Sequence, residues 1–341
     1  MAKHHIFFIL FVSFSAGSIS ADTCPNLAKR LFVFGDSYLD TGNGRHPYGP
    51  WVPPFGASMG GPSGRFSDGL VWTDYLAQLM GIDTPTPMAR ADWRNPATTR
   101  TGVNIAYGGA GLYPTAFMPE SMKAQMNHLQ FFIDNKTFTE CDLKNSLAFI
   151  SISGNDYGAY ADAAFPSKKN VEAYTVAVVA QLASNVQWLH LRGIGKVAVA
   201  SLPPLGCLPE IAGDSDYPGN CNQTVNEGAR RHNDALRAAV DALNMVNGEQ
   251  SIAYVDFYRG FSDAMDEHVR TAKSKEYANP TKRCCEGNGG RCGDVDKDGK
   301  LLYKFCDQPL QSFFFDGAHP AQHGWELVFQ ALKDDIKKIL P

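Results

Sequence analysis

Residues 32–43 read FVFGDSYLDTGN, and this stretch shows how the chain is organised. Its first three residues are an apolar run that is typical of a buried strand. The turn formers Gly35, Asp36 and Ser37 follow the run directly, so the strand is expected to end there. A serine after a strand is commonly a solvated turn residue or a helix N-cap, and it can also be a nucleophile. The stretch by itself leaves both interpretations of Ser37 open.

Short β-like runs and longer helix-like runs alternate along the rest of the chain. The expected strands span residues 31–34, 102–106, 147–153, 196–201 and 252–257, and the expected helices span 71–80, 122–133, 171–191, 225–245 and 325–340. Strand, helix and strand repeated in this way predict an α/β fold with a mostly parallel sheet of about five strands and helices on both faces. Ligand sites in such sheets gather at the carboxyl ends of the strands.

Two stretches interrupt this alternation. Residues 45–69 are crowded with Gly, Pro and aromatic residues, and are expected to form a long loop that ends where Ser67 or Asp68 can cap a helix. Residues 279–312 contain four cysteines and much glycine, and are expected to form an excursion held by disulfides. Neither stretch divides the chain, so we expect a single domain over residues 22–341.

Glycine and polar residues follow three of the expected strands at the point where each strand ends. Ser37 follows the first strand, Gly108 and Gly109 follow the second, and residues 154–156 (Gly-Asn-Asp) follow the third. Because the carboxyl ends of parallel strands meet at one edge of a sheet, these groups should open onto one rim.

A fourth polar group lies near the other end of the chain, in FFFDGAHPAQHGW at residues 313–325. Asp316 and His319 are three residues apart, which places both side chains on one face of a turn or helix start. A carboxylate that accepts from one imidazole nitrogen fixes the tautomer and leaves the other nitrogen free to take a proton from Ser37. Alone, this pair is more often a surface turn, so its significance depends on the other rim segments. No carboxylate precedes His323 at the same spacing, and we treat it as structural.

Acyl transfer also needs donors that face the oxygen on which negative charge develops. The segment VNIAYGGAG at 103–111 offers glycine N–H groups that can approach closely, and Asn155 in SISGNDY offers an uncharged amide. The alternative interpretations are a bulge or close packing for Gly108 and Gly109, and a helix cap for Asn155. All of these alternatives holding at once, after successive strands, is much less plausible than any one of them.

Taken together, these blocks resemble the GDSL esterase/lipase family, also called SGNH hydrolases. The blocks are GDS at 35–37, G-x-N-x-A-x-G-G-A-G at 102–111, GND at 154–156 and DGAHP at 316–320. The resemblance runs from about Leu31 to the C-terminal helix, and FVFGDSYLDTGN, GRFSDG, SLPPLGCLP and FFFDGAHP are similar to the secreted plant branch.

The resemblance implies a three-layer α/β/α sandwich and a role for each matching residue. Ser37 would be the nucleophile, His319 the base and Asp316 the partner that orients it. The Ser37 N–H, Gly109 and Asn155 would form the oxyanion hole; Gly109 is chosen over Gly108 by aligning the glycine before the small residue. Tyr38 stands where the name-giving motif has Leu, and we expect it to alter the pocket wall more than the chemistry.

The first 21 residues have the layout of a signal peptide, with Lys3, an apolar stretch and then small residues, and cleavage is expected near Ser20 or Ala21. No other segment approaches ~18 continuous apolar residues, so no integral membrane span is expected. Eight cysteines in an exported chain favour disulfides, with Cys207 and Cys221 as a candidate local pair and the other pairings left open. The sequons at Asn135 and Asn222 fit glycosylation in the same compartment.

Several other classes of site and partner are disfavoured. A net charge of -4 without long basic runs argues against nucleic acid as a partner.

The run DVDKDGK resembles the first half of a calcium-binding loop, but Phe305 stands where a bidentate Glu is required, so a solvated acidic turn is favoured. A G-x-S-x-G nucleophile elbow fails because Leu39 stands at its second glycine. Neither a metal nor a cofactor is expected, and His128, His190, His232 and His268 fall in helix-like runs without a metal-binding pattern.

The sequence therefore predicts a secreted, monomeric serine esterase or lipase that cleaves carboxylic esters through an acyl-enzyme, with the cell wall or the vacuole as candidate destinations. Its substrate could be a lipid, an acylated polysaccharide or a small metabolite ester. Two alternatives stay open: an acyltransferase that passes the acyl group to another acceptor, and a non-catalytic secreted binding protein.

Overall fold

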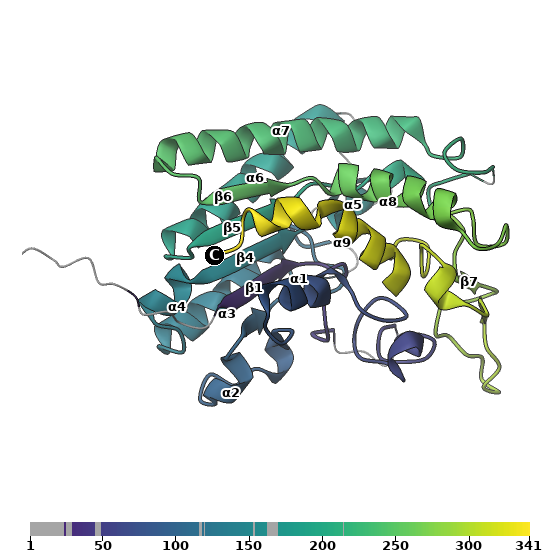
Figure 1. The fold of residues 1–341 in the computed structure, drawn as a ribbon, viewed down its shortest axis with the longest axis horizontal. Helices are drawn as coiled ribbons and strands as arrows, with labels where there is room; N and C mark the ends of the chain where they lie inside the picture. Colours follow the sequence, from purple (N-terminus) through teal and green to yellow (C-terminus); the bar gives the residue numbers. More distant parts are fainter. Residues whose placement is uncertain are drawn as a thin grey trace, which may run out of the picture.

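A computed structural model describes residues 24, 29–44, 49–115, 118, 120–152, 154–161, 170–213 and 215–341 of the chain (Figure 1). The expected signal peptide at 1–21 lies outside these residues, as do residues 45–48 of the expected long loop.

A parallel sheet forms the middle layer of the molecule. The described residues give it six strands in the spatial order β2-β3-β1-β4-β5-β6, and every neighbouring pair is parallel. The strands are β1 (Arg30–Gly35), β2 (Thr86–Pro87), β3 (Gly102–Asn104), β4 (Ser146–Ser151), β5 (Lys196–Ala200) and β6 (Ile252–Val255). The α/β prediction and the five expected strands are confirmed. The additional edge strand β2 is two residues long and contains Pro87, which is too little for a sequence pattern.

Helices cover both faces of the sheet (Figure 1). They are α1 (Trp72–Met80), α2 (Pro96–Thr99), α3 (Met122–Asp134), α4 (Glu140–Lys144), α5 (Gly154–Ala161), α6 (Val171–Leu191), α7 (Gln223–Asn247), α8 (Phe257–Thr271) and α9 (Gln322–Lys337). Alternate side chains of β1 enter different cores, because successive residues of a strand face opposite ways. Leu31 and Val33 pack with α1, α8 and α9, whereas Phe32 and Phe34 pack with α3, α6 and α7. This is the expected three-layer sandwich.

Helix α8 is an element that the sequence pattern missed. The apolar run of β6 suggested that the strand continues to Phe257, but the strand ends at Val255 and Phe257 begins the helix. Asp256 makes this transition, since its side chain accepts a hydrogen bond from Arg259 N at 3.0 Å as an N-cap.

The end of β1 is held in a conformation that only glycine accommodates. Gly35 has φ +150°, and a Cβ there would lie 2.1 Å from Ser151 O on β4. The buried carboxamide of Gln125 on α3 closes around the same residue: Oε1 accepts from Gly35 N at 2.8 Å and Nε2 donates to Gly35 O at 2.7 Å. The chain therefore leaves the sheet at a fixed point, and Ser37 follows two residues later.

The DTGN block at 40–43 ties the loop after β1 to the loop after β3. Asp40 accepts from Gly42 N and Asn43 N at 2.8 and 2.7 Å, and its other oxygen accepts from Gly108 N at 2.9 Å. Asn43 Nδ2 in turn donates to Asn104 O and Ala106 O, both at 2.8 Å. Two segments of the predicted rim are thereby locked together.

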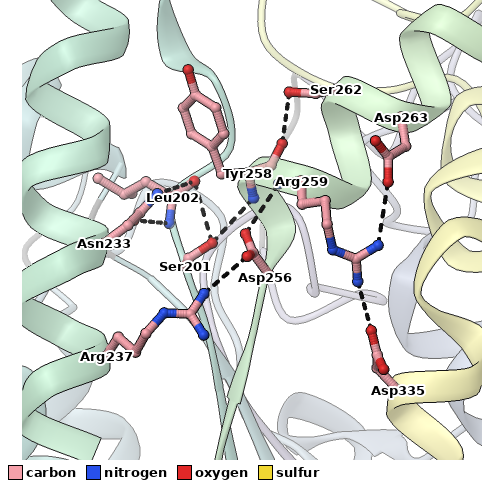
Figure 2. A network of polar contacts seen from close by, with 10 residues as sticks. All are labelled: Ser201, Leu202, Asn233, Arg237, Asp256, Tyr258, Arg259, Ser262, Asp263 and Asp335. Carbon is pink, nitrogen blue, oxygen red and sulfur yellow. Dashed lines mark hydrogen bonds and ion pairs between the residues drawn. The ribbon is translucent and has the colours of Figure 1, made fainter.

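Hydrogen bonds from α7 and α8 hold the segment that follows β5, as Figure 2 shows. Asn233 on α7 receives a hydrogen bond from Leu202 N and donates one to Leu202 O, at 2.8 and 2.9 Å. Ser201 Oγ accepts from Tyr258 N at 3.1 Å, where α8 begins. In the same view, Arg259 joins Asp263 on α8 to Asp335 on α9. The segment beyond Leu202 then reaches the DGAH turn, where Glu210 N donates to Gly317 O at 2.9 Å.

Residues 279–312, which we call the disulfide lobe, lie at one end of the molecule around β7 (Cys285–Gly287) and β8 (Tyr303–Phe305) (Figure 1). The lobe contains the disulfides Cys284–Cys306 and Cys285–Cys292, so the expected stapled excursion is confirmed. The candidate pair Cys207–Cys221 is also present, and Cys24 pairs with Cys141.

Candidate active site

The structure brings Ser37, His319 and Asp316 into one hydrogen-bonded chain. Nε2 of His319 lies 2.8 Å from Ser37 Oγ, and Nδ1 lies 2.9 and 2.8 Å from the two carboxylate oxygens of Asp316. Ser37 and His319 are 282 positions apart in sequence, so the fold alone makes this contact. A histidine that donates from Nδ1 to a carboxylate has Nε2 free to accept the serine proton.

The turn 316–319 holds its own carboxylate in place. Asp316 Oδ1 accepts from the backbone N–H of Ala318 at 2.9 Å and of His319 at 2.8 Å. The backbone also closes on itself, since Phe315 N donates to His319 O at 2.8 Å. The carboxylate is therefore oriented by the main chain as well as by the imidazole.

Electrostatics favours the charged pair that forms when His319 takes a proton. Burial alone raises the pKa of the Asp316 carboxyl, but the facing His319 and the backbone donors outweigh burial, and the pKa of Asp316 lies below its ordinary value. Burial likewise lowers the pKa of His319, but the charge and hydrogen bond of Asp316 outweigh it and raise that pKa above its ordinary value. Each partner thus stabilises the ionised form of the other.

Gly108 and Gly109 follow β3 at the same rim but are bound differently. The Gly108 N–H is used by Asp40, and a Cβ on Gly108 would lie 2.3 Å from Cζ of Phe66, so close packing requires glycine there. Gly109 has φ +82°, and its N–H has no partner among the described residues. Of the two, Gly109 has the N–H that is free to bind another oxygen.

Asn155 lies beside this segment, at the start of α5. One hydrogen of its amide is donated to Ala110 O at 2.9 Å, which fixes the side chain next to Gly109. Asp156 secures the same loop by accepting from Leu112 N at 2.9 Å and Tyr113 N at 3.1 Å, and burial raises the pKa of Asp156 to about 6. Among the described residues, Asn155 Nδ2 donates only to Ala110 O, so its second N–H can make a further bond.

Tyr38 does not contribute to the pocket wall as the sequence suggested. Its ring packs against the hydrophobic core that contains Phe261 and Trp325, and its hydroxyl donates to Ala318 O at 2.9 Å. The prediction was wrong because the residue after Ser37 faces the layer of α8 and α9, a direction that the motif does not show.

His319 and Asp316 of the triad line a cleft of about 1050 Å³. His319, Gly108 and Gly109 line it on the sheet side. Residues 49–66 contribute Val52, Phe55 and Phe66, and the disulfide lobe contributes Arg283, Cys285 and residues 289–295 among others. The Phe66 ring lies 5.2 Å from the imidazole of His319, centroid to centroid. The cleft thus combines apolar, glycine-rich and charged walls around Asp316 and His319.

Two charged side chains of the cleft escaped the sequence analysis. Glu210 and Arg283 both lie next to Gly317, and Arg283 donates to Pro209 O at 2.8 Å. Neither belongs to a recognisable motif, and each comes from a different loop. Only the arrangement of the two loops around the DGAH turn could have identified them.

The other singled-out residues lie away from the triad. Asp296 accepts from the N–H groups of Asp298 and Lys300, both at 2.9 Å, as in an acidic turn. Within the described residues, no group of three or more His, Cys, Asp or Glu side chains is placed to hold a metal ion. His232 is buried, which lowers its pKa to about 4, and it bonds to Tyr157 Oη at 2.9 Å.

The two sequons differ in exposure. Asn222 is exposed, and its Oδ1 caps α7 by accepting from Thr224 N and Val225 N. Asn135 is half-buried, and its Nδ2 donates to Phe131 O at 2.8 Å. Among the helices that the structure describes, none has the length and apolar character needed to cross a membrane.

Comparisons with known proteins agree with the motifs. The family model described as GDSL-like lipase/acylhydrolase matches residues 31–332. One GDSL esterase/lipase of Arabidopsis thaliana is 35% identical over 317 residues, covering 92% of this chain and 88% of its own length. Another from the same plant is 37% identical over 314 residues, covering 90% and 86%. A solved extracellular lipase of Streptomyces rimosus covers 91% of this chain and 100% of its own, at 15% identity and a TM-score of 0.38.

The family match spans most of the chain, and the Arabidopsis relatives align over most of both lengths at more than 30% identity. The resemblance found in the sequence blocks is thereby confirmed. The chain belongs to the GDSL-like lipase/acylhydrolase family and is a carboxylic ester hydrolase.

Proposed function

We propose that the protein is a secreted serine esterase that works through a covalent acyl-enzyme on Ser37. The observation that carries the proposal is the unbroken chain of hydrogen bonds from Ser37 Oγ through the imidazole of His319 to the Asp316 carboxylate. In the first step, Ser37 Oγ bonds to the ester carbonyl carbon while its proton moves to His319 Nε2. The carbonyl oxygen becomes an oxyanion.

The oxyanion would be bound by the N–H groups of Ser37 and Gly109 and by the amide of Asn155. Support comes from the free N–H of Gly109 and from the bond that holds Asn155 beside it. The carbon–oxygen bond to the alcohol then breaks, and the alcohol leaves with the proton from His319. Water adds to the acyl-enzyme with the same residue as base, and the acid leaves as the proton returns to Ser37.

Replacing Ser37 by Ala tests the assignment directly. We expect kcat/KM for a short p-nitrophenyl ester to fall by roughly 10⁴-fold or more, because the nucleophile is lost while the binding groups remain. Labelling by a fluorophosphonate probe should disappear as well. The melting temperature should stay near that of the wild type.

The matched control is Ser274→Ala, which alters an exposed serine in the segment after α8. Its turnover and labelling should equal those of the unaltered protein. Turnover that survives in a folded Ser37→Ala variant would refute the nucleophile, and absence of labelling in the wild type would favour a binding protein.

The proposal includes export as a single domain over residues 22–341, acting as a monomer after removal of residues 1–21. The four disulfides suit an oxidising compartment. Asn222 is the better glycosylation candidate, since the residue is exposed and its capping bonds use Oδ1, whereas Asn135 Nδ2 would have to release Phe131 O.

Acyl transfer to another alcohol stays the second candidate. The observation in its favour is the cleft of about 1050 Å³, which has room for an acceptor alcohol beside a short acyl group. The ratio of transfer product to free acid, measured with candidate acceptor alcohols, separates the two activities.

A further inference from the structure

Tyr38 connects the two segments that supply the nucleophile and the base. It follows Ser37 directly, and its Oη donates to Ala318 O, a bond that spans 280 positions in sequence. Ala318 immediately precedes His319. One side chain therefore links the serine turn to the histidine turn, without passing through the reacting atoms.

The phenol ring of Tyr38 is held firmly on three sides. It stacks on Phe261 of α8 with centroids 6.1 Å apart and an interplanar angle of 15°, and it meets Trp325 of α9 edge-on at 5.1 Å. Both partners are fully buried, at 0% and 1% exposure. The imidazole of His319 faces the same ring edge-on at 6.1 Å. The position of the hydroxyl is thus set by the core.

The bond to Ala318 completes the fixation of the histidine turn. Asp316 Oδ1 binds the N–H of Ala318 and His319 from inside the turn, while Tyr38 binds the carbonyl of Ala318 from outside. Ala318 is therefore held both by its N–H, which donates to Asp316, and by its carbonyl oxygen, which accepts from Tyr38. A leucine at position 38, as in the name-giving family motif, has no hydroxyl to supply the outer bond.

We propose that Tyr38 is a positioning residue that keeps the His319 imidazole aligned with Ser37 Oγ by fixing the carbonyl of Ala318. The inference rests on the proposed function. Its physical basis is that proton transfer depends steeply on geometry, so a displacement of about 1 Å can cost on the order of 10²-fold in rate. The Tyr38 hydroxyl bonds to a backbone carbonyl and the proton is transferred between Ser37 Oγ and His319 Nε2, so Tyr38 acts through the histidine turn.

Tyr38→Phe removes the hydroxyl and keeps the ring in its aromatic cluster. Losing a single neutral hydrogen bond should lower kcat by roughly 5- to 20-fold, while KM stays within about twofold of the wild type. The rate of fluorophosphonate labelling of Ser37 should fall by a similar factor. Rates are to be expressed per labelled active site, so that unfolded protein does not count as slow enzyme.

Tyr75→Phe is the matched control. Tyr75 Oη donates to Gln322 O at 3.2 Å, and its ring stacks on Phe329 at 5.6 Å, so it makes the same kinds of contact to the same C-terminal segment. Its bond reaches the chain three residues beyond His319. We expect Tyr75→Phe to lower the urea midpoint about as much as Tyr38→Phe does, with kcat within about twofold of the wild type.

Equal kcat for Tyr38→Phe and the wild type would overturn the inference, and so would equal loss of kcat in the two tyrosine variants. A rise in KM without a change in kcat would also overturn it, because that result would place Tyr38 in substrate binding. The proposed function is judged separately by Ser37→Ala, whose retained turnover would refute the nucleophile whatever Tyr38→Phe does.

Discussion

Two effects act in opposite directions on the pKa of the His319 imidazole. Its surroundings are buried, which favours the neutral ring, and the Asp316 carboxylate favours the charged ring and prevails. A raised pKa makes the base stronger, but it also means that the base is already protonated at a higher pH. The pH dependence of the reaction should show both consequences.

We expect kcat/KM to fall as pH decreases, with a midpoint above 6.5, the ordinary imidazole value. The sign follows because only neutral His319 can accept the Ser37 proton, and its pKa lies above that value. Asp316→Asn should move the midpoint to lower pH and reduce kcat by roughly 10³- to 10⁴-fold. Initial rates with a p-nitrophenyl ester from about pH 5 to about pH 9 measure both effects.

Asp241→Asn provides the comparison, since Asp241 is an exposed residue of α7. Its pH profile should coincide with that of the wild type. A midpoint at or below 6.5 in the wild type, or one that Asp316→Asn leaves in place, would contradict the assignment of Asp316 as the partner of His319.

At the scale of elements, the contact between α3 and the end of β1 determines where the nucleophile segment starts. Gln125 is completely buried and satisfies the Gly35 N–H, whereas Gly35 O has a second donor in Tyr107 N at 3.0 Å. The N–H is therefore the group that depends on Gln125. No other acceptor of the described residues bonds to it.

Gln125→Met should destabilise the fold by roughly 1–3 kcal/mol, because it leaves a buried N–H without an acceptor at similar side-chain volume. Lys123→Met, on the exposed side of the same helix, should change stability by less than about 0.5 kcal/mol. Urea unfolding followed by far-UV circular dichroism gives both values. Equal stability of the two variants would show that the Gln125 bonds are not needed to hold Gly35.

The sequence predicts elements well where one strong local pattern decides the structure. The apolar runs of β1, β4 and β5 each end in turn formers, and the structure has strands there. Helix α8 was missed because its apolar first residue continues the pattern of β6, and only the capping bond of Asp256 marks the change.

The residues of the candidate site also fall into those that a local motif identifies and those that depend on long-range packing. Ser37, Asp316 and His319 could be identified because each lies in a short recognisable block. The direction of Tyr38 and the presence of Arg283 in the cleft could not, since they depend on contacts between distant segments, 280 positions apart for Tyr38 and Ala318 and 74 for Arg283 and Pro209.

At the scale of the whole molecule, the two larger hydrophobic cores of the described residues are built on the same sheet. Alternate residues of β1 belong to the two cores, and so do alternate residues of β4, with Phe149 in one and Ile150 in the other. Neither core can lose its sheet without exposing the other. We therefore expect the described layers to unfold together.

Urea unfolding should show one transition that is the same for both cores. In a variant with Trp51, Trp93 and Trp188 replaced by Phe, fluorescence reports only Trp72 and Trp325 of the first core, while circular dichroism reports the helices of both. The two curves should coincide if unfolding is cooperative. Two separated midpoints, in the variant and in the wild type followed by both probes, would contradict a single folding unit.

The disulfide lobe gives the cleft a wall that is covalently closed on itself. Cys284–Cys306 and Cys285–Cys292 both lie inside the lobe. The lobe contacts the histidine segment through backbone bonds such as Cys285 N to Phe315 O at 2.6 Å, and through packing of Phe305 on Phe315 with ring centroids 6.2 Å apart. Residues 286–289, between the cysteines of one cross-link, are exposed, so their number and charge can change while the buried Cys285 and Phe315 keep the lobe attached to the histidine segment. Changes of ester preference can thus arise from substitutions and insertions within the lobe, while Ser37, His319 and Asp316 stay the same.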